Sequence, residues 1–127
     1  MASLLLVGYT QPILDELNGA FMGLDFSHCS AMWSYSAFNG FRSRLMEEAH
    51  YSWDDVLSRK GADPLHVLLN HSDCEGYIEV ADCIPLADRL AEVTASWWAD
   101  DKDRYETVLL IKGLRAASVR GEVLKFL

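Results

Sequence analysis

The segment from His71 to Asp82 places carboxylates, a glycine and an aliphatic residue at the spacing of the twelve-residue calcium loop of an EF-hand. Gly76 stands at the sixth position, where the backbone turns sharply, and Ile78 stands at the eighth, where an aliphatic side chain is buried. The oxygen ligands that this spacing predicts are Asp73, Glu75, the Tyr77 carbonyl, Glu79 and Asp82, with His71 at the first position. His71 departs from the pattern because imidazole is a poor calcium ligand, and Asp82 is shorter than the usual bidentate Glu.

The same loop also offers softer atoms for a second kind of metal site. Imidazole and thiol ligands for tetrahedral zinc can be drawn from this loop and an earlier one: His71, Cys74, Cys83 and either His28 or Cys29. Such a site would stabilise the domain, or it would serve a metal-dependent enzyme with His71, Asp73 and His28 around the ion. The plain alternative is a polar turn in which Asp73 binds backbone amides and the cysteines pack in the core.

Acidic residues concentrate between positions 63 and 106. The chain has 19 Asp and Glu against 11 Lys and Arg, which gives a formal net charge of −8. The excess of acids in this segment equals the whole net charge. A negative field repels nucleic-acid phosphates and attracts cations or basic protein surfaces. We therefore expect a protein partner with a basic surface and no direct binding to nucleic acid.

A pair of tryptophans lies at the edge of this acidic segment. Trp97 continues an apolar helical stripe, so its ring is expected to face inward while the Trp98 ring lies near the surface. An exposed tryptophan beside acids suits the anchoring of a partner protein. The predicted interaction residues are Trp98, Asp100, Asp101 and Asp103.

The elements that must position these residues are mostly helical. Apolar spacing and capping residues predict helices over 35–49, 52–60, 63–69, 82–98 and 103–121. The predicted caps are Ser34 and Asp82, and the predicted capping boxes are Ser52 with Asp55 and Asp103 with Glu106. The stripe of the fourth helix that is expected to face inward is Leu86, Leu90, Val93 and Trp97. Short strands are expected at 77–80 and 123–127, with a further strand at 3–7 and a helix at 11–21. Residues 23–32 are expected to form a loop. Within the last helix, the stripe expected to face inward is Tyr105, Val108, Leu109, Ile111 and Leu114.

These elements predict a mostly α fold, a small helical bundle with one or two short β segments, with α+β as the alternative class. A chain of 127 residues suits one domain, with 1–21 as an N-terminal extension of a core at 22–127. No apolar run approaches the length of about 20 residues that crosses a bilayer. Three cysteines do not make a secreted disulfide framework, so we expect reduced thiols and a cytoplasmic location.

Three stretches of the chain carry a recognisable pattern: Met22-Gly23-Leu24-Asp25-Phe26-Ser27-His28-Cys29, then Trp33-Ser34-Tyr35-Ser36-Ala37-Phe38 with Phe41-Arg42, and Leu68-Leu69-Asn70-His71-Ser72-Asp73-Cys74-Glu75-Gly76. Together they resemble a family of small uncharacterised proteins of bacteria and their phages. The resemblance implies no established activity, cofactor or catalytic residue. Together with the confined negative charge, it favours a non-catalytic interaction protein, such as a phage or prophage accessory factor. The rival hypothesis is the metal-dependent enzyme.

Overall fold

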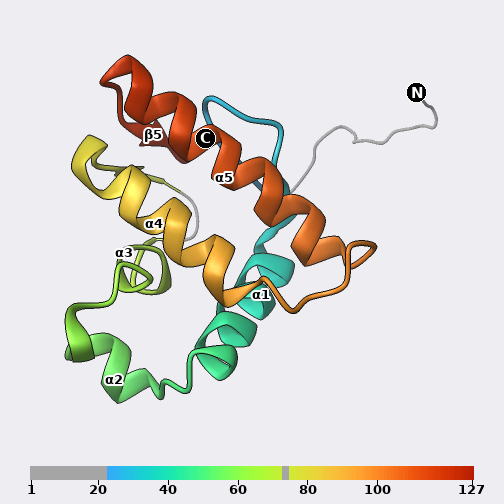
Figure 1. The fold of residues 1–127 in the computed structure, drawn as a ribbon, viewed down its shortest axis with the longest axis vertical. Helices are drawn as coiled ribbons and strands as arrows, with labels where there is room; N and C mark the ends of the chain where they lie inside the picture. Colours follow the sequence, from blue (N-terminus) through green and yellow to red (C-terminus); the bar gives the residue numbers. More distant parts are fainter. Residues whose placement is uncertain (1–22, 73–74) are drawn as a thin grey trace.

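The computed structural model describes residues 23–72 and 75–127 (Figure 1). Their elements in chain order are β2 (Gly23–Asp25), β3 (Met32–Ser34), α1 (Tyr35–Glu48), α2 (Trp53–Leu57), the 3-10 helix η1 (Lys60–Ala62), α3 (His66–Leu69), β4 (Tyr77–Ile78), α4 (Val80–Val93), α5 (Lys102–Arg120) and β5 (Leu124–Lys125). This arrangement confirms the prediction of a mostly α fold with short β segments. The strand expected at 3–7 and the helix expected at 11–21 lie outside the described residues.

Helix α1 begins where the sequence predicts. The Ser34 side chain accepts a hydrogen bond from the Ala37 amide at 3.1 Å and caps the helix. The loop expected at 23–32 is partly wrong, because β2 and β3 pair there as an antiparallel hairpin. Its strands are only three residues long, too short for alternation to distinguish them from loop. From this hairpin Trp33 enters the core and stacks on Phe41 of α1, with ring centres 4.6 Å apart.

Helices α4 and α5 lie side by side and pack against each other more extensively than any other pair of elements (Figure 1). The predicted inward stripe of α4, which includes Leu86, Leu90 and Val93, is buried as expected. Helix α4 begins at Val80, two residues before the predicted cap at Asp82, and ends at Val93, five residues before the predicted end at Trp98. Among the described residues, no helix is long and apolar enough to cross a membrane.

The predicted inward face of α5 is wrong in part. Tyr105 is 60% exposed and Val108 is half-buried, although Leu114 is fully buried as predicted. The face that is buried consists of Glu106, Thr107, Leu110, Gly113, Leu114 and Ala117. Apolar residues occur on more than one side of this helix, so the sequence pattern did not fix which side faces the core.

The segment after α5 joins the two strand pairs. β5 pairs with β4 in an antiparallel register, which confirms a strand within 123–127. Phe126 then forms a bridge with Phe26, and the Leu127 amide donates to the Asp25 carbonyl at 2.9 Å. Residues from both ends of the described chain therefore meet beside β4.

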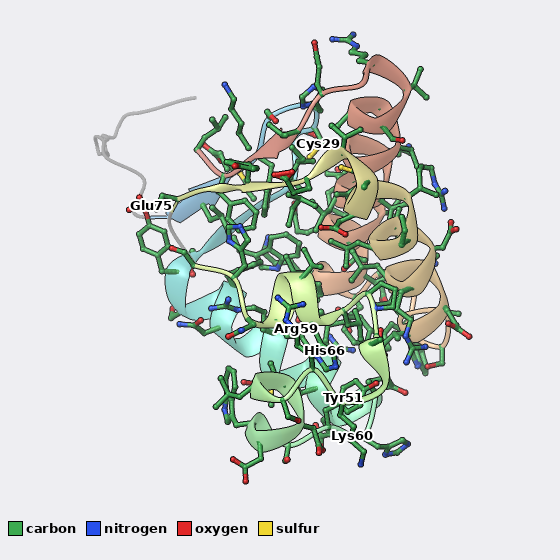
Figure 2. The ribbon with its side chains drawn as sticks, turned by 90° about the vertical axis from the view of Figure 1, so that its left-hand side faces the viewer. Cys29, Tyr51, Arg59, Lys60, His66 and Glu75 are labelled. Carbon is green, nitrogen blue, oxygen red and sulfur yellow. The ribbon has the colours of Figure 1, made fainter. Side chains whose placement is uncertain are left out.

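The connection between α2 and α3 lies at the opposite end of the molecule from Cys29 (Figure 2). Ser52 and Asp55 form the predicted capping box at the start of α2. The buried His66 ring bonds through Nε2 to the Lys60 carbonyl at 2.8 Å and packs against Tyr51. This connection thus depends on a buried histidine that the sequence did not single out.

Candidate functional site

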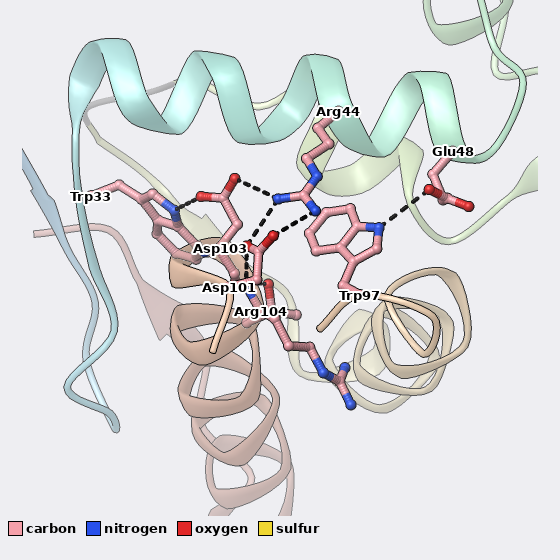
Figure 3. A network of polar contacts seen from close by, with 8 residues as sticks. Trp33, Arg44, Glu48, Trp97, Asp101, Asp103 and Arg104 are labelled. Carbon is pink, nitrogen blue, oxygen red and sulfur yellow. Dashed lines mark hydrogen bonds and ion pairs between the residues drawn. The ribbon is translucent and has the colours of Figure 1, made fainter. Parts of the chain in front are cut away.

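The loop between α4 and α5 presents the two tryptophans in opposite ways. Trp97 is buried, and its indole Nε1 donates a hydrogen bond to Glu48 Oε1 at 3.2 Å (Figure 3). Trp98 is 80% exposed. The structure therefore bears out the expectation that one ring faces inward and the next faces solvent.

Arg44 of α1 holds this loop in place (Figure 3). Its guanidinium carbon lies 3.7 Å from the centre of the Trp97 ring, a cation–π contact. Its two terminal nitrogens donate to the two carboxylate oxygens of Asp101, at 2.9 and 2.7 Å. The hydrogen bond from Arg44 lowers the pKa of the Asp101 carboxyl to about 2.

Asp101 and Asp103 have internal roles as well as charge. Asp101 Oδ1 accepts the backbone amides of Asp103 and Arg104, and so caps α5. Asp103 accepts the Trp33 indole Nε1 at 3.0 Å and also pairs with Arg44 at 3.2 Å. The capping box predicted from Asp103 and Glu106 is wrong, because Asp101 is the cap and Glu106 instead accepts the Met32 amide. Of the three aspartates predicted to face a partner, only Asp100 is exposed.

Much of the acidic segment is neutralised within the fold. The acids of this segment that lie in ion pairs are Asp63, Asp88, Glu92, Asp101, Asp103 and Glu106. Asp63 and Arg89 form a largely buried pair at 2.9 Å, and the Asp63 side chain also accepts the Tyr51 hydroxyl. Arg44 and Arg115 come from outside residues 63–106, so the local excess of negative charge in this segment is smaller in the fold than in the sequence.

The predicted cation loop forms internal bonds in its described part. The His71 ring bonds through Nδ1 to the Ser72 carbonyl at 2.8 Å and through Nε2 to the Tyr77 carbonyl at 3.0 Å. Both partners are backbone carbonyl oxygens, which are acceptors. The ring also stacks on Phe126, with centres 4.0 Å apart. The Tyr77 oxygen, one of the predicted ligands, is therefore already engaged.

The other predicted ligands do not converge in the described part of the chain. Glu75 and Glu79 are exposed, and Asp82 lies in the first turn of α4. Within residues 23–72 and 75–127 there is no group of three or more His, Cys, Asp or Glu placed to hold a metal ion. Asp73 and Cys74 lie outside the described residues, so the cation loop and its zinc alternative stay predictions.

The two described cysteines behave as packing residues. Cys29 lies against Gly113 of α5, and Cys83 is fully buried in α4. Burial raises the pKa of both thiols above the ordinary value. Neither is therefore a ready thiolate ligand or nucleophile.

Ser27, His28 and Glu122 form a cluster of polar side chains that the sequence did not predict. Ser27 Oγ lies 2.7 Å from His28 Nδ1, and His28 Nε2 lies 2.7 Å from Glu122 Oε1. From its sequence position, His28 was predicted only as a metal ligand. His28 has a left-handed backbone, with φ of 69°, and Glu122 is 94 residues away. No local spacing shows either property.

Comparisons of this chain with protein-family models, with curated proteins and with solved structures found no match. The resemblance drawn from the sequence therefore stays an expectation.

Proposed function

We propose that this protein is an interaction module that binds a partner protein, with Trp98 as the anchor of its binding surface. The observation that carries the proposal is the 80% exposure of Trp98 beside a buried Trp97. Tryptophan is enriched among the few residues that dominate binding energy at protein interfaces. A large ring left in solvent on an ordered loop is suited to insertion into a partner's pocket.

The loop that carries Trp98 is organised before any partner binds. Trp97 is fixed by Arg44 and Glu48, and Asp101 fixes the start of α5. A surface that is already ordered loses little conformational entropy on association. These contacts support Trp98 as a rigid anchor.

The chemistry of the proposed partner follows from charge. The net charge of −8 attracts a basic surface over long range and raises the association rate. Near Trp98, the exposed Asp100 is the acid that stands outside the Arg44 network. We therefore expect an apolar pocket over Trp98 and a Lys or Arg of the partner opposite Asp100.

The test compares two exposed tryptophans. Wild-type protein captures its partner from an extract, the partner is identified and purified, and dissociation constants are measured by titration calorimetry. Trp98→Ala should weaken binding by about 30-fold or more, the effect of losing an anchor worth about 2 kcal/mol. Trp53→Ala, which alters a tryptophan 54% exposed on α2, is the matched control. Equal affinity for wild type and Trp98→Ala would refute the proposal.

Of the three aspartates beside Trp98, only Asp100 can be changed to a positive charge without also disturbing the fold. Replacing Asp101 or Asp103 would also break the α5 cap or the bonds to Arg44. Asp100→Lys should slow association at low salt and lose this effect at high salt, because salt screens exposed charges. An association rate that does not change would show that the partner's surface is not basic at this point.

A further inference from the structure

The turn between β2 and β3 brings a hydroxyl, an imidazole and a carboxylate into one chain of hydrogen bonds. Ser27 Oγ, His28 and Glu122 Oε1 are joined by two contacts of 2.7 Å each. A nucleophile within hydrogen-bond reach of a base, with the base oriented by a third group, is the signature of an activated nucleophile. Such triads recur on unrelated folds and are recognised by geometry and roles.

The carboxylate of Glu122 sets the direction of the hydrogen bonds that join it to His28 and Ser27. Glu122 accepts from Nε2, and the hydrogen bond from His28 lowers the pKa of the Glu122 carboxyl below its ordinary value. In the tautomer that carries its proton on Nε2, the His28 ring donates to Glu122 and its Nδ1 accepts from the Ser27 hydroxyl. The roles of the two ring nitrogens are exchanged relative to the familiar serine triad, but the order of the three groups is the same.

The backbone around this cluster is both strained and anchored. His28 adopts a φ of 69°, a conformation that costs energy for a non-glycine residue and that clusters at functional sites. The Lys125 amide donates to Ser27 Oγ at 2.8 Å, and the Ser27 amide donates to the Lys125 carbonyl at 2.9 Å. The first of these N–H groups also stabilises Oγ as it loses its proton.

The cluster opens onto a hollow of about 420 Å³. Its lining residues are Ser27, His28, Glu122, Val123 and Lys125. Val123 offers an apolar wall, and the volume suits a small ligand. Trp98 lies just before the start of α5, and this hollow lies at the end of that helix. A helix of 19 residues is about 28 Å long, so the hollow is separate from the surface around Trp98.

We propose that Ser27, His28 and Glu122 form a hydrolytic site for small esters with short acyl chains. Ser27 Oγ attacks the ester carbonyl carbon, its proton passes to His28 Nδ1, and a new C–O bond forms. The bond to the leaving alcohol breaks, and the alcohol takes the proton from His28. Water then attacks the acyl-serine with His28 as base, releasing the acid and restoring Ser27.

A fluorophosphonate probe tests this site directly, because it forms an O–P bond to an activated serine as fluoride leaves. The site of labelling is located by mass spectrometry of the whole, folded protein. Ser27 should be labelled at least about tenfold faster than the exposed Ser30, because general-base assistance contributes about 10²–10⁴-fold. Equal labelling of the two serines overturns the proposal.

Matched variants separate chemistry from a purely structural role. Glu122→Gln keeps a hydrogen-bonding side chain at an exposed position but removes its charge, and His28→Asn keeps a residue that tolerates the left-handed backbone. Each should slow labelling of Ser27 and hydrolysis of p-nitrophenyl acetate by about tenfold or more, with unchanged circular dichroism. Ser30→Ala should match wild type. Labelling of Ser27 at the wild-type rate in folded Glu122→Gln overturns the proposal.

Discussion

The guanidinium of Arg44 lies over the Trp97 ring at 3.7 Å while it binds both carboxylate oxygens of Asp101. One side chain of α1 thus fixes both the buried residue before the exposed Trp98 and the cap of α5. Stacking and paired hydrogen bonds both require a planar group with several donors. The position therefore depends on arginine and not on positive charge alone.

Replacing Arg44 with lysine should lower the stability of the protein although the charge is kept. Arg44→Lys loses the stacked contact and the paired bonds to Asp101, so we expect the free energy of unfolding to fall by about 1 kcal/mol. Arg115→Lys is the control, because Arg115 and Asp88 form an exposed pair that contributes little. Urea unfolding measures both, and an equal small effect in the two variants would contradict this account.

Lowering the pH should remove the stabilising effect of the ion pair between Arg44 and Asp101. The folded pKa of Asp101, about 2, lies below its ordinary value of 3.8. Its stabilising effect is therefore complete above about pH 4 and is lost as the pH falls toward 2. Asp101→Asn keeps a capping side chain but no charge. The stability difference between wild type and this variant should shrink over that range in urea unfolding, and a constant difference would argue against the ion pair.

Two glycines should respond in opposite directions to alanine. A Cβ on Gly113 would lie 2.7 Å from Cys29, so Gly113→Ala should cost about 1–3 kcal/mol by overpacking. Gly40 lies inside α1, where an added Cβ would meet nothing within 4 Å, so Gly40→Ala should add about 0.5–1 kcal/mol. Thermal unfolding compares the two, and a stable Gly113→Ala would mean that the Cys29 turn moves easily.

Calcium provides the test of the predicted cation loop. Both ring nitrogens of His71 bond carbonyl oxygens in the structure, so His71 could coordinate an ion only by giving up one of these contacts. We expect the melting temperature to stay unchanged in millimolar calcium. A clear rise, lost in Asp73→Asn, would instead support the oxygen cage predicted from the sequence.

The sequence predicted best what depends on neighbouring residues. Ser34 caps α1 and Ser52 opens α2 because each bonds an amide three positions later. Trp97 is buried as predicted, but the helix that was expected to carry it ends at Val93, so contacts in the loop after α4 hold its ring inward. Helix α5 has apolar residues on several sides, so the apolar pattern of its sequence does not determine which side faces the core; packing against the rest of the fold does.

What the sequence could not show depends on contacts between distant residues. Arg44 meets Asp101 across 57 positions, and His28 meets Glu122 across 94. The left-handed turn at His28 follows no glycine or proline signal. It is the packing of Cys29 on Gly113 and the pairing of Ser27 with Lys125 that place this turn.

The joining of both strand pairs by residues 124–127 has a consequence for the order in which the protein assembles. Helices α4 and α5 are neighbours in the chain, so their docking closes only a short loop. The bridge between Phe26 and Phe126 closes a much longer one, with a larger entropic barrier. We expect a helical hairpin to form early and the strand ends to close late, which leaves the Ser27 turn as one of the last regions to reach its native shape.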